Sequence, residues 1–357
     1  MKFGILLTPG SDAPGLVQQA EEQGYDTAFF VDSPALFGDP WVSMGATAAR
    51  TQRITLGIGV TNPLTRSSPV TASSLAGLNA LAPGRVALGI GVGFTATLAM
   101  GMRRARLAEL ERYIEEVRQL LAGEEAEVDL LGEPTIVQFL RQEQPWVNLQ
   151  DPIPVYVAAA NPNSLEMAGR VADAVILGGL TQPEIIDTCR ELLDVGAKKA
   201  GRRADDIELT ITPSVLVTDR EWSFEELQTE LGPKSMAPAM NFSRIASIST
   251  AAPDYLKREW DDIRHAYFGD SGGASDPRRK HIATYRNYVV SLEDWQRPYV
   301  TRSVLDGTSI AGTPEQCLAK IAMLERHGVG HILMSPHPER VRETIDAYGR
   351  DIFPHLK

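Results

Sequence analysis

The sequence predicts an α/β protein, a (β/α)8 TIM barrel with insertions that forms a single domain over residues 1–357. Short, nearly continuous apolar segments alternate with longer amphipathic ones, which is the pattern of a parallel sheet covered by helices. Eight such apolar segments occur, and the chain is long enough for a barrel with a large core. A doubly wound open sheet has the same local pattern, and the count of eight favours the barrel.

The predicted strands are rich in β-branched and apolar residues, as buried parallel strands are. They cover residues 2–8, 27–31, 54–60, 86–92, 155–159, 174–178, 208–217 and 331–334. The predicted helices cover residues 14–23, 39–51, 67–81, 106–122, 163–171, 183–199, 314–327 and 338–348. Proline stands at or near the start of several helices and glycine follows the end of others, as helix termini favour.

Two segments are longer than an ordinary connection between strand and helix. Residues 124–154 form an excursion that is long enough for a small hairpin. Residues 232–306 form a larger, helical insertion rich in methionine and aromatic residues. We interpret the insertion either as a satellite core or as a lid over the mouth of the barrel, and the two interpretations are compatible.

The amino-acid composition limits which classes of partner and which cellular compartment we expect. The chain has 46 acidic and 35 basic residues, a formal charge of −11, which disfavours nucleic acid and anionic membrane surfaces. Only two cysteines occur, and no apolar stretch reaches the roughly 18 residues of a membrane span or the form of a signal peptide. We therefore expect a cytoplasmic protein that acts on a small-molecule substrate.

Glycines interrupt two neighbouring strands near their carboxyl ends, where barrel enzymes have their active sites. The segments are Gly57-Ile58-Gly59-Val60-Thr61-Asn62 and Gly89-Ile90-Gly91-Val92-Gly93-Phe94. Glycine inside a strand weakens it and marks a bulge or the close approach of a ligand. We predict a flat floor on which a planar ring lies against the main chain; the alternative is that small residues only fit the barrel taper.

Asp32 follows the second predicted strand and is a candidate acid or base, or else a cap of the turn. A phosphate group could be held where the fifth and sixth strands run into helices, because free N–H groups point outward there. These segments contain Ala159, Ala160 and Asn161, and Gly178, Gly179 and Thr181.

Other chemistries have no matching motif in the sequence. The G-x-G-x-G at residues 89–93 lacks the third glycine spacing and the acidic residue of a dinucleotide-binding fingerprint. Walker A, G-x-S-x-G and HExxH motifs are absent, so we expect no metal site and no serine hydrolase.

Three blocks of the sequence resemble the luciferase-like flavin- and deazaflavin-dependent oxidoreductases, especially those similar to methylenetetrahydromethanopterin reductase. They are LGIGVTNPLTRSSPVTASSLAGLNALAPGRVALGIGVGFTATLAMG (56–101), PVYVAAANPNSLEMAGRVADAVILGG (154–179) and IAGTPEQCLAKIAMLERHGVGHILMSP (310–336). With residues 1–53 the resemblance covers most of the chain and omits 232–306.

The resemblance implies that FMN or coenzyme F-420 binds at the barrel mouth of a homodimer. Gly59-Val60 corresponds to a peptide bond behind the ring that is often cis, and Asn62 to a residue at the ring edge. The implied cofactor-binding residues are Gly59, Val60, Thr61, Asn62, Gly91, Gly93, Phe94, Ala159, Ala160, Asn161, Gly178, Gly179 and Thr181, with Asp32 and Asn62 as catalytic candidates. Asp32-Ser33 stands where many F-420 members have Asp-His, and a histidine typical of the monooxygenases is missing.

Our first choice of function is a two-component monooxygenase that uses reduced FMN supplied by a partner flavin reductase. The alternative is a coenzyme F-420-dependent enzyme that transfers hydride to or from a carbonyl, imine or alkene, with Asp32 as acid or base. A non-catalytic flavin-binding protein and a phosphosugar isomerase on the same fold are further alternatives, although no Lys or Glu stands at a predicted strand end for the isomerase.

Overall fold

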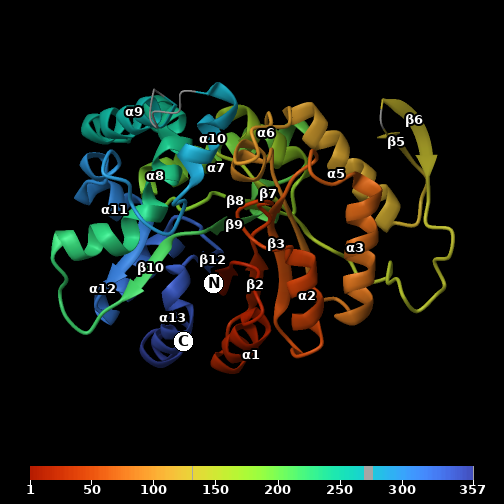
Figure 1. Ribbon diagram of the computed structural model, residues 1–357, viewed down its shortest axis with the longest axis horizontal. Helices are drawn as coiled ribbons and strands as arrows, with labels where there is room; N and C mark the ends of the chain where they lie inside the picture. Colours follow the sequence, from red (N-terminus) through yellow and green to blue (C-terminus); the bar gives the residue numbers. More distant parts are fainter. Residues whose placement is uncertain (131, 269–275, 357) are drawn as a thin grey trace.

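The computed structural model describes residues 1–130, 132–268 and 276–356. Eight parallel strands form a closed barrel in the order β1-β12-β9-β8-β7-β4-β3-β2, which confirms the predicted barrel (Figure 1). They are β1 (Lys2–Leu7), β2 (Thr27–Phe30), β3 (Thr55–Thr61), β4 (Val86–Ile90), β7 (Val155–Ala158), β8 (Ala174–Ile176), β9 (Glu208–Ile211) and β12 (His331–Met334).

Helices cover the outside of the barrel between successive strands, as the alternating pattern predicts. They are α1 (Ala13–Gln23), α2 (Pro40–Ala48), α3 (Ser68–Leu81), α5 (Leu107–Leu121), α6 (Pro162–Val171), α7 (Pro183–Lys199), α12 (Pro314–Arg326) and α13 (Val341–Asp351). The short helix α4 (Phe94–Leu98), which the pattern did not predict, directly follows β4. No helix in the described part of the chain is both long and apolar enough to cross a membrane.

The predicted strand at 208–217 is wrong as a single element. It divides into β9, which stays in the barrel, and β10 (Ser214–Val217), which leaves the barrel and pairs in parallel with β11 (Ser309–Gly312). Pro213 separates the two, and proline cannot donate a hydrogen bond to a neighbouring strand. The break places Thr212 at the carboxyl end of the barrel.

The two longer segments lie on different sides of the barrel (Figure 1). Within 124–154, β5 (Ala126–Leu130) and β6 (Glu133–Val137) form an antiparallel hairpin. The other segment contains α8 (Phe224–Ile248), α9 (Asp254–Phe268), α10 (Lys280–Tyr285) and α11 (Arg302–Thr308), and α8 packs against α9 and α11. Its first helix begins before the predicted start at residue 232, and residues 269–275 lie outside the described residues.

The inside of the barrel is filled by a small apolar cluster that separates its two ends. Phe29, Ala87, Tyr156, Ala174, Ile176 and Leu333 form this cluster. Leu6, Val60 and Ala158 pack against it on the side of the strand carboxyl ends. The cluster therefore supports the base of whatever site lies at that end.

Candidate functional site

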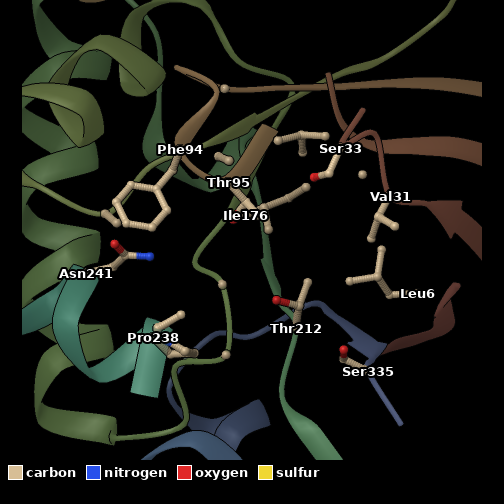
Figure 2. Close-up of a pocket in the computed structure, with 18 of the residues that line it drawn as sticks. Leu6, Val31, Ser33, Phe94, Thr95, Ile176, Thr212, Pro238, Asn241 and Ser335 are labelled. Carbon is tan, nitrogen blue, oxygen red and sulfur yellow. The ribbon is translucent and has the colours of Figure 1, made fainter. Parts of the chain in front are cut away.

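A cavity of about 830 Å³ opens at the carboxyl ends of the strands, where the fold predicts the active site. Figure 2 shows Phe94 and Asn241 facing each other on one side of the cavity, with Leu6, Val31 and Ser33 on the other. Helix α8 supplies part of the wall, which is mostly apolar with a few polar groups. Such a cavity has the size and character of a cofactor or substrate site.

Neighbouring main-chain segments of β3 and β4 form one wall of the cavity. The Gly59–Val60 peptide bond is cis, and the pairing of β3 with β4 shifts register between Ile58 and Thr61. Gly59, Val60 and Gly91 all line the cavity. A Cβ atom on Gly91 would lie 3.3 Å from both Val60 Cγ2 and Ala158 Cβ, so even a methyl group would crowd this wall. The wall therefore presents main chain and small side chains to the cavity. A Cβ atom on Gly59 would point instead at Leu6 Cδ1 (3.0 Å) and Phe29 Cβ (3.2 Å).

Two of the glycines assigned to this floor serve a different purpose, which corrects the sequence analysis. Gly57 lies deeper, where a Cβ atom would be 2.5 Å from the Phe29 ring. Gly89 faces the main chain of Ile58, with a Cβ position 2.0 Å from its carbonyl oxygen. Neither residue lines the cavity, because the bulge displaces the open surface toward the strand ends.

Gly93 and Phe94 join the floor to helix α4. Gly93 has a φ of +81° and precedes the first helical residue, so its backbone conformation favours glycine. A Cβ atom there would also lie 2.7 Å from Thr97 Cγ2. The Phe94 side chain lines the cavity, and the Arg104 guanidinium lies 5.4 Å from its ring centre.

Asp32 follows β2, is only 6% exposed and lines the cavity. Burial raises the pKa of this carboxyl above its usual range, the Thr61 hydroxyl and the Arg66 guanidinium lower it in part, and Asp39 raises it. In the described part of the chain no backbone N–H donates to the carboxylate, so the structure gives no support to the cap interpretation. A buried carboxyl with a raised pKa in a cavity wall makes Asp32 a candidate acid or base.

Three predicted residues do not line the cavity: Asn62, Thr61 and Thr181. Asn62 is fully buried, accepts hydrogen bonds from the amides of Leu64 (3.0 Å) and Thr65 (3.1 Å), and donates to Thr65 Oγ1 (2.9 Å). It stabilises the loop after β3 and does not face a ring edge. Sequence position alone could not separate these roles, because asparagine after a strand commonly caps a turn.

The other two residues lie behind the wall of the cavity. Thr181 Oγ1 donates to the Asp306 carbonyl (3.0 Å), so its hydroxyl ties the loop after β8 to α11. Thr61 Oγ1 is buried without a hydrogen-bond partner of normal geometry among the described residues, and its effect is on the pKa of Asp32.

The predicted phosphate cradle is formed by residues that do line the cavity: Ala159, Ala160, Asn161, Gly178 and Gly179. Ser164 Oγ accepts from the amides of Ala160 (3.2 Å) and Asn161 (3.1 Å), and Asn161 Oδ1 accepts from the Ser164 amide (3.1 Å). Side chains at the start of α6 thus already accept hydrogen bonds from some of the backbone N–H groups there. Gly179 lies under α8, since its Cβ position is 2.7 Å from Pro238 Cγ.

Several residues of the cavity were not predicted from the sequence. Thr212 and Ser335 follow β9 and β12. Active-site residues of such barrels follow the carboxyl ends of the strands, so both could have been predicted once the break at Pro213 was recognised. Lys234 and Asn241 come from α8. The sequence could not have placed this helix over the barrel, because its position depends on long-range packing.

Lys234 lies near the middle of α8 and lines the cavity. Its Nζ donates to Ser335 Oγ (3.0 Å) and to the Pro336 carbonyl (2.6 Å). Burial lowers the pKa of the ammonium to about 8. In the described part of the chain no cluster of His, Cys, Asp and Glu residues could hold a metal ion.

The barrel and the cavity at its carboxyl end are typical of (β/α)8 enzymes, whose active sites lie at the strand ends. The model of the luciferase-like monooxygenase family matches residues 3–331, and the chain belongs to this family. The family and the oxidoreductase class predicted from the sequence are confirmed.

Relatives within this family carry a reductase or dehydrogenase name. The chain is 30% identical over 363 residues to the 5,10-methylenetetrahydromethanopterin reductase of Methanolobus tindarius, which covers 99% of both chains. It is 32% identical over 300 residues to the F-420-dependent glucose-6-phosphate dehydrogenase of Nakamurella multipartita, covering 78% of this chain and 83% of that protein.

Solved structures agree on the fold. The coenzyme F-420-dependent tetrahydromethanopterin reductase of Methanopyrus kandleri superposes with a TM-score of 0.67 at 22% identity, covering 100% of this chain and 99% of the other. A long-chain alkane monooxygenase has the same TM-score of 0.67 at 14% identity, covering 100% and 91%. At these identities the similarity shows the shared barrel and does not choose a substrate.

Proposed function

We propose that this protein is a coenzyme F-420-dependent oxidoreductase that transfers hydride to or from a carbonyl, imine or alkene carbon of a small organic substrate. This was the alternative in the sequence analysis. It is now preferred to the FMN-dependent monooxygenase, because relatives that span most of the chain are named as reductases and F-420-dependent dehydrogenases. The long-chain alkane monooxygenase, at 14% identity, is similar in fold only.

The cavity fits a flat tricyclic cofactor. Gly59, Val60 and Gly91 leave a surface of main chain and small side chains against which a ring can lie. Ala160 and Gly179 line the part of the cavity assigned to the phosphate end. When bound, coenzyme F-420 supplies or accepts the hydride; the protein's residues bind it, orient the substrate and exclude water.

The observation that carries this proposal is the buried carboxyl of Asp32 on the cavity wall. Hydride transfer to a carbonyl or imine carbon is completed by a proton at the neighbouring oxygen or nitrogen. A carboxyl whose pKa is raised by burial keeps its proton to higher pH than an exposed one. Asp32 is therefore proposed as the acid in reduction and the base in oxidation.

The test is anaerobic titration of the purified protein with coenzyme F-420 and, separately, with FMN, followed by absorbance. We expect micromolar binding of coenzyme F-420, and a panel of alcohols, aldehydes and cyclic imines to change the deazaflavin band without oxygen. Oxygen uptake stoichiometric with substrate in the presence of reduced FMN would contradict the proposal and restore the monooxygenase with its partner flavin reductase. Binding of a flavin without turnover in either assay would support the storage protein.

We also propose that the protein is a homodimer, which the family resemblance implies. Light scattering on the purified protein measures it. A monomer at working concentration would remove this element and leave the cofactor assignment untouched.

A further inference from the structure

We propose that Lys234 is the residue that recognises an anionic group, a carboxylate or phosphate, on the substrate. The inference rests on the proposed function, because it assumes that a cofactor occupies the opposite side of the same cavity.

The surroundings of Lys234 hold its ammonium in place without neutralising it. Both acceptors, the Ser335 hydroxyl and the Pro336 carbonyl, are uncharged. In the described part of the chain no carboxylate pairs with Lys234, whereas Lys2, Lys198 and Lys199 each pair with one. An ammonium has three donors, and two of them are used. A charge removed from water without a counter-charge is costly, and an anionic ligand would supply that counter-charge.

The position of Lys234 leaves room for a substrate between it and the floor. In the strand order of the barrel, β12 lies four strands from β4 in either direction, so the two are opposite. Ser335, which binds the Lys234 ammonium, follows β12, whereas Gly91 and Phe94 follow β4. Figure 2 shows Ser335 and Phe94 on opposite sides of the cavity. A ring lying on the floor would have Lys234 across the cavity from it.

The charge of the wall also favours an anion. The described residues that line the cavity include one acid, Asp32, and four bases: Arg104, Lys234, Arg244 and Arg264. Asp261 already pairs with Arg264 at 2.6 Å. The site is therefore locally positive on a chain whose formal charge is −11, and such a region attracts anionic ligands.

An anion in the cavity has two possible sources, the substrate and the cofactor itself. The segments assigned to the cofactor's phosphate end, around Ala160 and Gly179, follow β7 and β8. The Lys234 ammonium is instead bonded to the segment after β12. This difference favours the substrate, and the experiment separates the two sources.

The experiment uses the full chain with ¹³Cε-labelled lysine and inorganic phosphate and acetate as probes. The Lys234 resonance is assigned by its absence in Lys234→Met. We expect both anions to shift this resonance saturably at constant ionic strength. The affinity should fall about tenfold for each pH unit above about 8, because only the ammonium binds an anion.

Variants give a second measurement by calorimetry. Lys234→Met should weaken phosphate binding at least about tenfold, or roughly 1.4 kcal/mol, and Lys234→Arg should restore it. The matched control is Lys320→Met, because burial also lowers the pKa of Lys320 to about 8, its Nζ donates to the Asp306 carbonyl, and it does not line the cavity. Near-ultraviolet circular dichroism checks that each variant is folded.

Three outcomes would overturn the inference. The Lys234 resonance could fail to respond to either anion, or Lys320→Met could weaken binding as much as Lys234→Met. Lys234→Met could also lower the affinity for coenzyme F-420 or FMN about tenfold, which would assign the ammonium to the cofactor. Failure of the protein to bind either cofactor contradicts the proposed function instead, and the anion titration of the cofactor-free protein still tests Lys234.

Discussion

The two ends of the barrel both depend on glycine, with opposite results. At the amino end and in the central cluster, Gly4 and Gly57 make room for other side chains: their Cβ positions would overlap the Thr27 hydroxyl and the Phe29 ring, respectively. At the carboxyl end, Gly91 lines the cavity, and its Cβ position meets the small side chains of Val60 and Ala158, at 3.3 Å. Glycine therefore makes room for packed side chains in one part of the barrel and contributes to a cavity wall in the other.

The polar groups at the two ends differ in the same way. At the amino end, His331 is fully buried, with Nε2 2.9 Å from Thr27 Oγ1 and Nδ1 3.5 Å from Glu208 Oε1. Glu208 also pairs with Lys2 at 2.7 Å and accepts from the Tyr156 hydroxyl at 3.1 Å. These groups satisfy one another, which stabilises the fold.

At the carboxyl end, Lys234 and Asp32 face the cavity without ion-pair partners within 4 Å in the described part of the chain, and the Thr61 hydroxyl has no regular hydrogen bond. Polar groups that lack partners mark the cavity end as the candidate binding site, whereas the mutually paired groups at the amino end stabilise the fold.

The largest effects are expected from a matched pair of glycine substitutions. Gly57→Ala places a methyl group 2.5 Å from the buried Phe29 ring and should lower the free energy of unfolding by about 3 kcal/mol, the upper end of the usual cost of overpacking. Gly91→Ala meets its neighbours at 3.3 Å and should cost less than about 1 kcal/mol.

The effects of this pair on cofactor affinity should be reversed. Gly91→Ala should weaken binding at least about tenfold, and Gly57→Ala, where it folds, should leave binding almost unchanged. Urea denaturation and cofactor titration measure the two quantities. Equal effects of both substitutions on both measurements would remove the distinction between the two ends.

Glu208→Gln tests the closed network at the amino end. Burial alone would raise the pKa of Glu208, but its interactions with His331 and Lys2 outweigh this and hold the pKa at about 2. A carboxylate with a lowered pKa stabilises the folded state above its unfolded value near 4.5, and this contribution is lost as the pH falls toward 2. We expect the variant to be about 2 kcal/mol less stable at neutral pH.

The difference between Glu208→Gln and the native chain should shrink in acid. Urea denaturation across that pH range checks this, and cofactor affinity at neutral pH serves as the control. A stability difference that stays constant down to pH 2 would show that the charge of Glu208 is not its cause.

The sequence predicted the barrel well because its evidence is periodic and local. Eight apolar segments are visible without knowing how they pair. The glycines, together with a resemblance to a known family, pointed to Gly59 and Gly91, and both line the cavity. The division at Pro213 was missed because β-branched residues continue on both sides of it. The sequence did indicate the division, because proline has no backbone N–H to donate to a neighbouring strand.

The side of the site formed by α8 could not be predicted in the same way. Lys234 lies far from any strand end in the sequence, and only the packing of α8 over the barrel brings it to Ser335. Asn62 differs from this expectation in another way: the family resemblance implied a contact with the ring edge, but its side-chain amide is used by the adjacent loop. Chain position does not reveal which way a polar side chain turns.

Asp32→Asn tests whether the unpaired carboxyl at the open end has a chemical role. The substitution retains shape and removes the transferable proton, so turnover should fall more than about tenfold, or roughly 1.4 kcal/mol in the barrier, with cofactor affinity unchanged. Steady-state kinetics and a cofactor titration give the two values. Ser33→Ala, at a neighbouring residue that also lines the cavity, is the control and should change turnover much less. Unchanged turnover in Asp32→Asn would remove Asp32 from the proposed chemistry.

Thr61→Val should have the smallest effect and a specific direction. Burial raises the pKa of Asp32 and the Thr61 hydroxyl opposes that rise, so removing the hydroxyl should raise the pKa further. The decline in the rate of reduction at high pH, which follows loss of the Asp32 proton, should then move to higher pH. Stability should change by less than about 0.5 kcal/mol or improve slightly, because the buried hydroxyl has no regular partner to lose. A pH profile that moves to lower pH, or does not move while turnover falls, would show that Thr61 acts on the site through something other than Asp32.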